Sequence, residues 1–122
     1  MKLYIQGALP TLNQYINAER SSKFFAASMK KNATRSVALQ LKTQVKEIIG
    51  ICHYTFIWHC KDRRIDPDNI CYAKKFILDG MVSAGIISND GWANVAGFID
   101  IFVQSDSDHV EIDIVRESER NA

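Results

Sequence analysis

The stretch Ile51-Cys-His-Tyr-Thr-Phe-Ile-Trp-His-Cys60 decides the fold, because it is rich in aromatic and β-branched residues. Runs of this composition form β-strands. Both sets of alternating side chains are largely apolar, so the pattern predicts a central strand that is apolar on both faces. Its large aromatic side chains, Tyr54, Phe56 and Trp58, are expected in the core rather than on a surface that stacks bases.

The residues before this strand predict another strand and a helix. Residues 2–7 alternate polar and apolar side chains and end at a Gly-Ala-Leu-Pro turn, which indicates a short strand. A loop that includes Asn13 is expected next. Neither proline nor glycine interrupts the helical spacing of apolar residues over 21–49, which predicts one long amphipathic helix that ends at Gly50. Residues 32–35 are its weakest stretch.

The residues after the central strand predict a second helix and two more strands. Residues 61–66 are abruptly charged and indicate a loop, and Asp66 or Asp68 is a suitable cap for a helix that continues to Gly85. Residues 95–104 and 109–116 are expected to form a hairpin. The resulting order, β-α-β-α-β-β, predicts an α/β (α+β) fold with two main helices on a mixed four-stranded sheet.

Length and charge limit the classes of protein to consider. A chain of 122 residues has room for one compact domain, expected over residues 1–117, with residues 118–122 as a frayed tail. No apolar run approaches the ~20 residues of a membrane span, and the first residues do not resemble a signal peptide. A cytoplasmic protein without a membrane partner is therefore expected. The net charge of +1 does not itself indicate nucleic-acid binding, although basic residues crowd the first third of the chain.

Cysteine and histidine do not indicate a metal site in this sequence. Cys52, Cys60 and Cys71 include no Cys-x-x-Cys pair, so neither a disulfide framework nor a zinc ribbon is indicated. Buried thiols are expected instead. His53 and His59 lie beside two of these cysteines, but the ends of the strand are ~25 Å apart, too far for all four residues to share one metal.

The stretch Asp62-Arg63-Arg64-Ile65-Asp66-Pro67-Asp68-Asn69 carries the most chemical information. Its last two aspartates, together with Asp90 beyond the helix, supply hard oxygen ligands of the kind that Mg²⁺ binds. Such a cation polarises a phosphate and activates water, and a nearby lysine stabilises the charge that develops. Each feature taken separately is more often a turn, a cap or a solvated helix face. Their combination favours a metal-dependent phosphodiesterase.

These residues resemble a known family. Asp66-Pro67-Asp68-Asn69, the helix with Lys75 and Asp79, and Asn89-Asp90-Gly91-Trp92 look like the RusA family of Holliday-junction resolvases. Residues 9–18 and Met29-Lys30-Lys31 resemble its phage and prophage branch in Gram-positive bacteria, and the likeness covers about residues 3–116. It implies a homodimer, Mg²⁺ or Mn²⁺ as cofactor, and paired symmetric nicks across a four-way DNA junction, in recombination, repair or phage DNA processing.

The resemblance also implies residue roles. Its three essential aspartates correspond to Asp66, Asp68 and Asp90, as metal ligands and catalytic residues. Its catalytic lysine corresponds to Lys74 or Lys75, because this chain has three more residues before the lysine than the enterobacterial prototype. Lys75 is preferred, because it lies seven residues after Asp68 and four before Asp79, and both spacings place residues on one helix face.

Further residues are expected around this site. The expected DNA contacts are Arg63, Arg64, Lys74, Lys30, Lys31 and Asn13. The two arginines are equally well explained as charges that keep a loop soluble. Asp79 is expected to support the site through an ion pair with Lys75, and Asn69 is placed in the same supporting group.

The distance from Asp90 to the other two aspartates limits the shape of the helix. A straight helix from Asp68 to Gly85 is ~26 Å long, and five further residues return at most ~17 Å. Either the helix is distorted or begins late, near Tyr72, or Asp90 completes the site of a partner subunit. A late or distorted start is favoured, because the extra residues before Lys75 lie there.

Other functions remain compatible with the same residues. The chain could be a catalytically silent module that binds branched DNA, a nuclease that prefers flaps or forks, or a structural phage protein whose acidic loop only caps a helix. All three expected ligands are aspartate, which argues against a silent relative.

Overall fold

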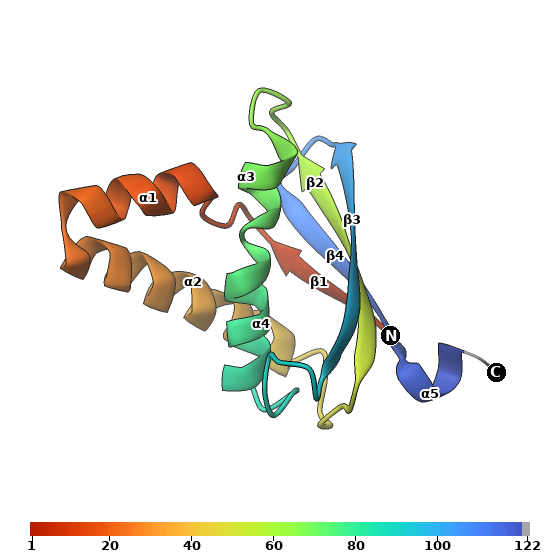
Figure 1. The fold of residues 1–122 in the computed structure, drawn as a ribbon. Helices are drawn as coiled ribbons and strands as arrows, with labels where there is room; N and C mark the ends of the chain where they lie inside the picture. Colours follow the sequence, from red (N-terminus) through yellow and green to blue (C-terminus); the bar gives the residue numbers. More distant parts are fainter. Residues whose placement is uncertain (121–122) are drawn as a thin grey trace.

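In the computed structural model, which describes residues 1–120, helices cover one face of a mixed four-stranded sheet (Figure 1). This arrangement confirms the predicted α+β class. In chain order the elements are β1 (Lys2–Gln6), α1 (Leu12–Ser21), α2 (Lys23–Lys42), β2 (Cys52–Cys60), α3 (Pro67–Cys71), α4 (Lys74–Ser83), β3 (Val95–Gln104), β4 (His109–Arg116) and α5 (Glu117–Arg120).

The strand order of the sheet is β1-β4-β2-β3. Strand β2 pairs in parallel with β3 and antiparallel with β4. The predicted hairpin of β3 and β4 is therefore wrong, because β2 lies between these two strands. Residues 105–108 cross the end of β2, where the Ser105 N–H donates to the Cys60 carbonyl at 3.0 Å. Four residues are enough, since the crossing spans two inter-strand spacings of ~4.8 Å.

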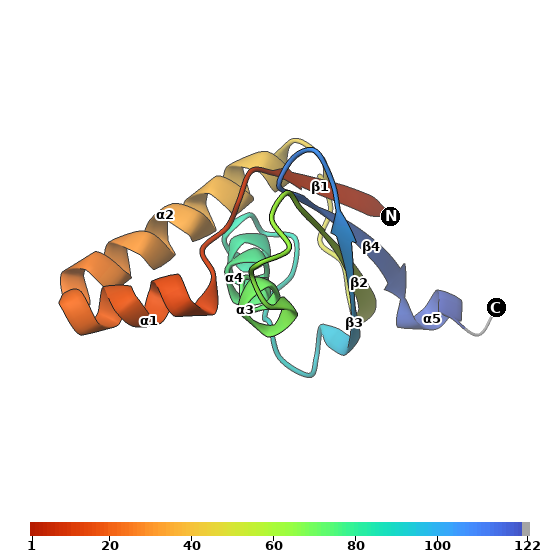
Figure 2. The same ribbon diagram turned by 90° about the horizontal axis from the view of Figure 1, so that it is seen from above.

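Strand β2 has one fully buried face, and that face carries the predicted aromatic core. Tyr54, Phe56 and Trp58 are at most 2% exposed and lie beneath the helices. The opposite side chains of β2 are only partly buried, although the pattern predicts an apolar face there as well. Figure 2 shows α1 to α4 on one side of the sheet and α5 on the other. The outer face of the sheet is thus open over most of its length.

The long helix expected over residues 21–49 is also corrected. Ser22 is extended, with φ −171° and ψ 137°, and separates α1 from α2. Its hydroxyl accepts hydrogen bonds from the N–H groups of Phe24 and Phe25, so a serine inside the predicted helix is in fact an N-cap. The expected loop around Asn13 is helix α1, which begins with a capping box formed by Thr11 and Gln14. Residues 32–35 lie within α2, which ends at Lys42.

The expected distortion of the helix after Asp68 is confirmed. Tyr72 and Ala73 separate α3 from α4, and the Ala73 N–H bonds to the Ile70 carbonyl three residues back, at 3.2 Å. Helix α4 then spans ten residues and is followed by Gly85, whose φ of +75° favours glycine and reverses the chain. The short helix allows the following loop to return beside α4.

The end of the chain forms the short helix α5. Residues 118–120 of the predicted frayed tail lie in this helix, and residues 121–122 lie outside the described residues. No helix in residues 1–120 is both long enough and apolar enough to cross a membrane.

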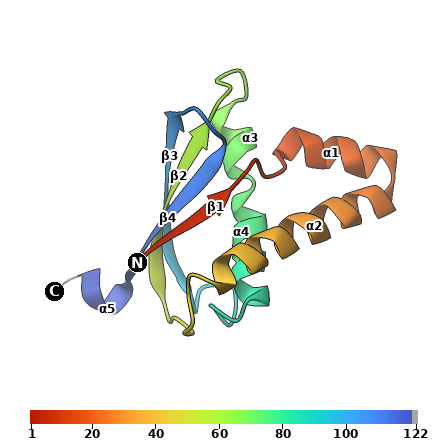
Figure 3. The ribbon, with the colours of Figure 1, turned by 180° about the vertical axis from the view of Figure 1, so that it is seen from behind.

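Helices α2 and α4 pack closely enough to require glycine at position 80 (Figure 3). A Cβ atom at Gly80 would lie 2.7 Å from Cβ of Val37, a fully buried residue of α2. We expect Gly80→Ala to lower the free energy of unfolding by about 1–2 kcal/mol, because the steric overlap exceeds the gain in helix propensity. Gly50→Ala, which meets no atom within 4 Å, is the matched control. Urea unfolding followed by circular dichroism measures both, and a Gly80→Ala variant as stable as wild type would contradict this packing.

Candidate active site

The structure brings Asp90 beside the first turn of α4. Lys75 Nζ lies 3.4 Å from Asp90 Oδ2 and 3.3 Å from Asp79 Oδ1. The expected ion pair between Lys75 and Asp79 is therefore confirmed, and the same ammonium group also holds Asp90. All three side chains remain accessible to solvent, with Lys75 49% exposed.

Lys75 keeps its positive charge in this arrangement. Partial burial lowers the pKa of Lys75, but the hydrogen bond to Asp79 and the charges of Asp79 and Asp90 outweigh that effect and raise the pKa above its ordinary value. The side chain is thus suited to stabilise negative charge at neutral pH, and unsuited to act as a general base.

Lys74 has a different environment from its neighbour. Its Nζ lies 2.7 Å from Asp100 Oδ2 on β3 and 4.5 Å from the ring centroid of Phe98. Asp100 also accepts a hydrogen bond from the indole N–H of Trp58 at 3.0 Å. Lys74 is only 18% exposed, so it ties α4 to the sheet. These contacts speak against the expected DNA contact of Lys74 and favour Lys75 as the lysine of the site.

Asp66 and Asp68 lie at the start of α3, where both are exposed. No lysine, arginine or histidine in residues 1–120 forms an ion pair with either carboxylate. Asn69 accepts a hydrogen bond from the backbone N–H of Asn13 at 3.2 Å, which connects this loop to α1. Asn13 therefore has a structural contact here as well as its expected role toward DNA.

The three expected ligands do not converge on one point in the single chain. Among the described residues, Asp66, Asp68 and Asp90 are not a group whose carboxylate oxygens all lie within 4.8 Å of one another. Helix α3 and the break at residues 72–73 separate the first two from Lys75 and Asp90. Exposed carboxylates without cationic partners have the donor chemistry that Mg²⁺ requires, which Asp66 and Asp68 fulfil.

Asn94 positions the loop that carries Asp90, and sequence reasoning missed it. It is 4% exposed, and its amide oxygen accepts from the Ser88 hydroxyl at 3.0 Å and the Asn89 N–H at 3.1 Å. Its amide nitrogen donates to the carbonyls of Ile49 and Gly50, both at 3.3 Å. One side chain thus ties the residues just before Asp90 to the segment that leads into β2. The only signal in the sequence was its place just after Asn89-Asp90-Gly91-Trp92.

The two arginines before the aspartates differ in their contacts. Arg64 forms a two-pronged ion pair with Asp62, with Nη2 2.8 Å from Oδ2 and Nε 2.9 Å from Oδ1. These hydrogen bonds lower the pKa of Asp62 to about 2. The guanidinium of Arg64 is thus paired within the loop, while its side chain remains 90% exposed. Arg63 is exposed, and in residues 1–120 it has no carboxylate partner.

A basic groove of about 740 Å³ runs between α2 and α4. Its charged lining residues are Lys30, Lys31, Arg35 and Lys42 from α2 and Asp79 from α4. The four basic residues are exposed, and none of them pairs with a carboxylate in residues 1–120. Asp79 connects this groove to Lys75 and Asp90. Lys30 and Lys31 thus line the same groove as Asp79.

A second polar cluster lies on the open face of the sheet. His59, His109 and Glu111 place candidate ligand atoms within 4.8 Å of one another. His59 is not expected as a ligand from its own strand, because His53 and Cys52 lie at the opposite end of that strand. Its partner residues come from β4 through strand pairing, which local sequence patterns do not reveal.

The hydrogen bonds of Asn94 predict a large effect of its removal. We expect Asn94→Ala to lower the free energy of unfolding by about 2–4 kcal/mol, because it leaves two carbonyls, a hydroxyl and an N–H group without partners. Asn32→Ala, an exposed change in α2, is the control and should change stability by less than about 0.5 kcal/mol. Thermal or urea unfolding measures both variants. Equal stability of the two would show that Asn94 does not anchor the loop.

Known proteins add no family assignment to this geometry. Comparison of the chain with protein-family models and with curated proteins finds no match. The likeness to RusA resolvases therefore rests on the residues themselves, above all Asp66, Asp68, Lys75 and Asp90.

Proposed function

We propose that this chain is a Mg²⁺-dependent endonuclease that cuts branched DNA, with the four-way junction as its preferred substrate. The observation that carries the proposal is the continuity of the basic groove with the Asp79, Lys75 and Asp90 cluster. A surface that binds phosphates through lysine and arginine leads directly to carboxylates and a protonated lysine. The motif likeness at Asp66 and Asp68 supports the same function.

The side chains have separate tasks in the proposed reaction. Asp66, Asp68 and Asp90 would hold the metal, which supplies Lewis-acid activation of the phosphate and of a water nucleophile. Lys30, Lys31 and Arg35 bind the DNA backbone and place the scissile phosphate. Lys75 donates hydrogen bonds to the phosphate oxygens as negative charge accumulates. Asn94 holds the loop of Asp90 in position through its four hydrogen bonds.

The proposal includes a homodimer in the cytoplasm of a bacterial host. A four-way junction has two-fold symmetry and needs two cuts, and a two-fold dimer with two sites matches it. Because the three aspartates do not converge in the single chain, such a dimer also offers a way to complete the metal site, with Asp90 of one subunit serving Asp66 and Asp68 of the other. Processing of recombining, repaired or phage DNA is the expected context.

The adjacent lysines provide the sharpest test of the site. We expect Lys75→Met to reduce cleavage of a synthetic four-way junction at least ~100-fold with normal stability, because a charge that stabilises the transition state is lost. Lys74→Met should instead lower stability, since it leaves Asp100 with one partner fewer. Gel assays of cleavage in Mg²⁺, paired with urea unfolding, separate the two effects.

Asp68→Asn distinguishes an enzyme from a silent binding module. This variant should bind the junction as tightly as wild type and should not cleave it. Full cleavage by Asp68→Asn would overturn the assignment, as would a wild-type protein that binds the junction without cutting it in Mg²⁺ or Mn²⁺. Flap and fork substrates in the same assay rank the substrate preference.

The basic groove predicts a steep dependence of junction binding on salt. We expect Lys31→Ala and Arg35→Ala each to reduce the slope of log K against log [salt] by about 1, because each removes one phosphate contact. Lys2→Ala, an exposed change on β1 outside the lining of the groove, is the control and should leave the slope unchanged. Fluorescence anisotropy with labelled junction between low and moderate salt measures the slopes. Slopes that respond equally to all three changes would exclude the groove as the DNA surface.

A further inference from the structure

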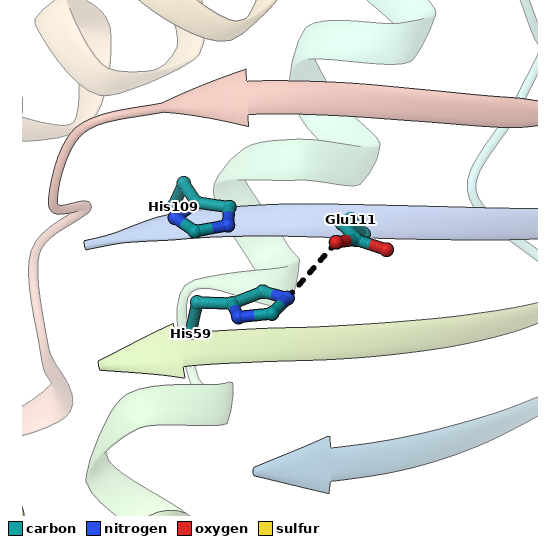
Figure 4. A group of neighbouring side chains, drawn as sticks. All are labelled: His59, His109 and Glu111. Carbon is teal, nitrogen blue, oxygen red and sulfur yellow. Dashed lines mark hydrogen bonds and ion pairs between the residues drawn. The ribbon is translucent and has the colours of Figure 1, made fainter. Parts of the chain in front are cut away.

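His59, His109 and Glu111 form a compact group on the outer face of the sheet, away from α2 and α4 (Figure 4). The antiparallel register of β2 and β4 places His59 directly opposite His109, and Ile57 opposite Glu111. Residues 109 and 111 point to the same face of β4, so both side chains meet His59. The group is thus built by strand pairing between residues about fifty positions apart.

The three side chains are arranged around a shared space. The imidazole rings of His59 and His109 are stacked, with centroids 4.0 Å apart and planes inclined by 9°. His59 Nε2 lies 3.0 Å from Glu111 Oε1. Figure 4 shows one nitrogen of each ring on the side of Glu111. Two imidazole nitrogens and a carboxylate oxygen, all within 4.8 Å of one another, are thus available to one ion.

Hydrogen bonds fix which nitrogen of His109 is available. Its Nδ1 lies 3.1 Å from the Ser107 carbonyl oxygen, which only accepts, and 3.0 Å from the Ser107 hydroxyl, which accepts or donates, so a proton on Nδ1 satisfies both contacts. Nε2 then presents its lone pair. A backbone carbonyl that binds the rear nitrogen is the usual outer partner of a histidine that ligates a metal, because it sets the tautomer and the ring orientation.

In residues 1–120, the imidazole of His59 forms a hydrogen bond through Nε2 alone. Its Nδ1 is buried and has no hydrogen-bond partner in the described part of the chain, which is unusual for a buried polar atom. No hydrogen bond at Nδ1 within these residues therefore opposes a rotation of the ring toward a metal ion. The side chains of His59 and Glu111 are 16% and 29% exposed, so an ion has access from solvent.

We infer that this group binds a divalent transition metal of the Zn²⁺ class, at a site separate from the proposed Mg²⁺ site. Two imidazoles and one carboxylate suit Zn²⁺, whereas Mg²⁺ prefers oxygen ligands alone. In tetrahedral coordination the ligand atoms are about 3.4 Å apart, so rotation of the stacked rings toward one another completes the site. Water takes the fourth position.

Bound metal would clamp the end of β2 to the start of β4. The loop that leads to Asp66 begins at that end, where the Lys61 N–H also donates to Asp108 Oδ1 at 2.9 Å. The inference does not depend on the nuclease assignment. It predicts that Zn²⁺ raises the melting temperature of the protein, because it binds the folded state alone.

Titration of the full chain with Zn²⁺, followed by calorimetry, tests the site. The Asp66→Asn/Asp68→Asn variant is used, so that the candidate Mg²⁺ ligands do not compete. We expect one ion per chain, and at least ~100-fold weaker binding in His109→Gln and in Glu111→Gln. Removal of a residue that only supports a ligand would weaken binding by less than this. His53→Gln is the matched control, because His53 lies on the same face of the same strand and pairs with Glu117.

Two further measurements use protein in which His59, His109 and Glu111 are unchanged, so they do not depend on whether the substituted variants fold. Co²⁺ should give visible absorption bands without a thiolate charge-transfer band, which separates this site from binding by Cys60. The ring proton signals of His59 and His109 should shift on addition of Zn²⁺, while those of His53 should not. Absence of saturable binding, binding that survives both His109→Gln and Glu111→Gln, or binding lost in His53→Gln would overturn the inference.

Discussion

The hydrogen bonds on both edges of β2 are the constraint on which the other features depend. Because β3 runs parallel to β2 and β4 runs antiparallel to it, residues 105–108 must cross the end of β2. The loop that leads to Asp66 and Asp68 begins at the same end of β2. That end of β2 also holds His59 against His109. The chain therefore gathers its two candidate metal-binding regions around one end of its central strand.

Local patterns predicted the elements whose structure is determined locally. Alternation identified β1 and β2, because side chains on one face of each strand meet the core. The predicted hairpin was wrong because a short polar turn permits pairing of β3 with β4 without requiring it. Both strands pair instead with β2, which lies between them. The long helix was predicted close to its observed start, because α2 begins at Lys23, but its end was wrong: α2 ends at Lys42, and residues 43–49 are not helical although apolar residues recur there.

In the candidate site, too, contacts between neighbouring residues of the chain could be predicted, whereas contacts between distant residues could not. Spacing along one helix was enough to prefer Lys75 and to pair it with Asp79, since both lie on one face of α4. Lengths left a distorted or late helix and a site shared between subunits as alternatives, and the extra residues before Lys75 favoured the break before α4. The anchor at Asn94 and the partners of His59 depend on contacts with residues more than forty positions away, which no local pattern contains. The open outer face of the sheet was hidden by the apolar composition of β2.

The two adjacent lysines show why position on a helix determines what a charged residue can do. Lys74 is mostly buried and forms a short ion pair with Asp100, so moving it toward a phosphate would leave a buried carboxylate short of a partner. Lys75 is half exposed, and its contacts with Asp79 and Asp90 are long; such surface pairs contribute only about 0–1 kcal/mol. In the proposed site, Asp90 would therefore exchange the ammonium for the metal ion at little cost. Lys75 would then be released toward the phosphate, so that the proposal couples binding of the cation to presentation of the lysine.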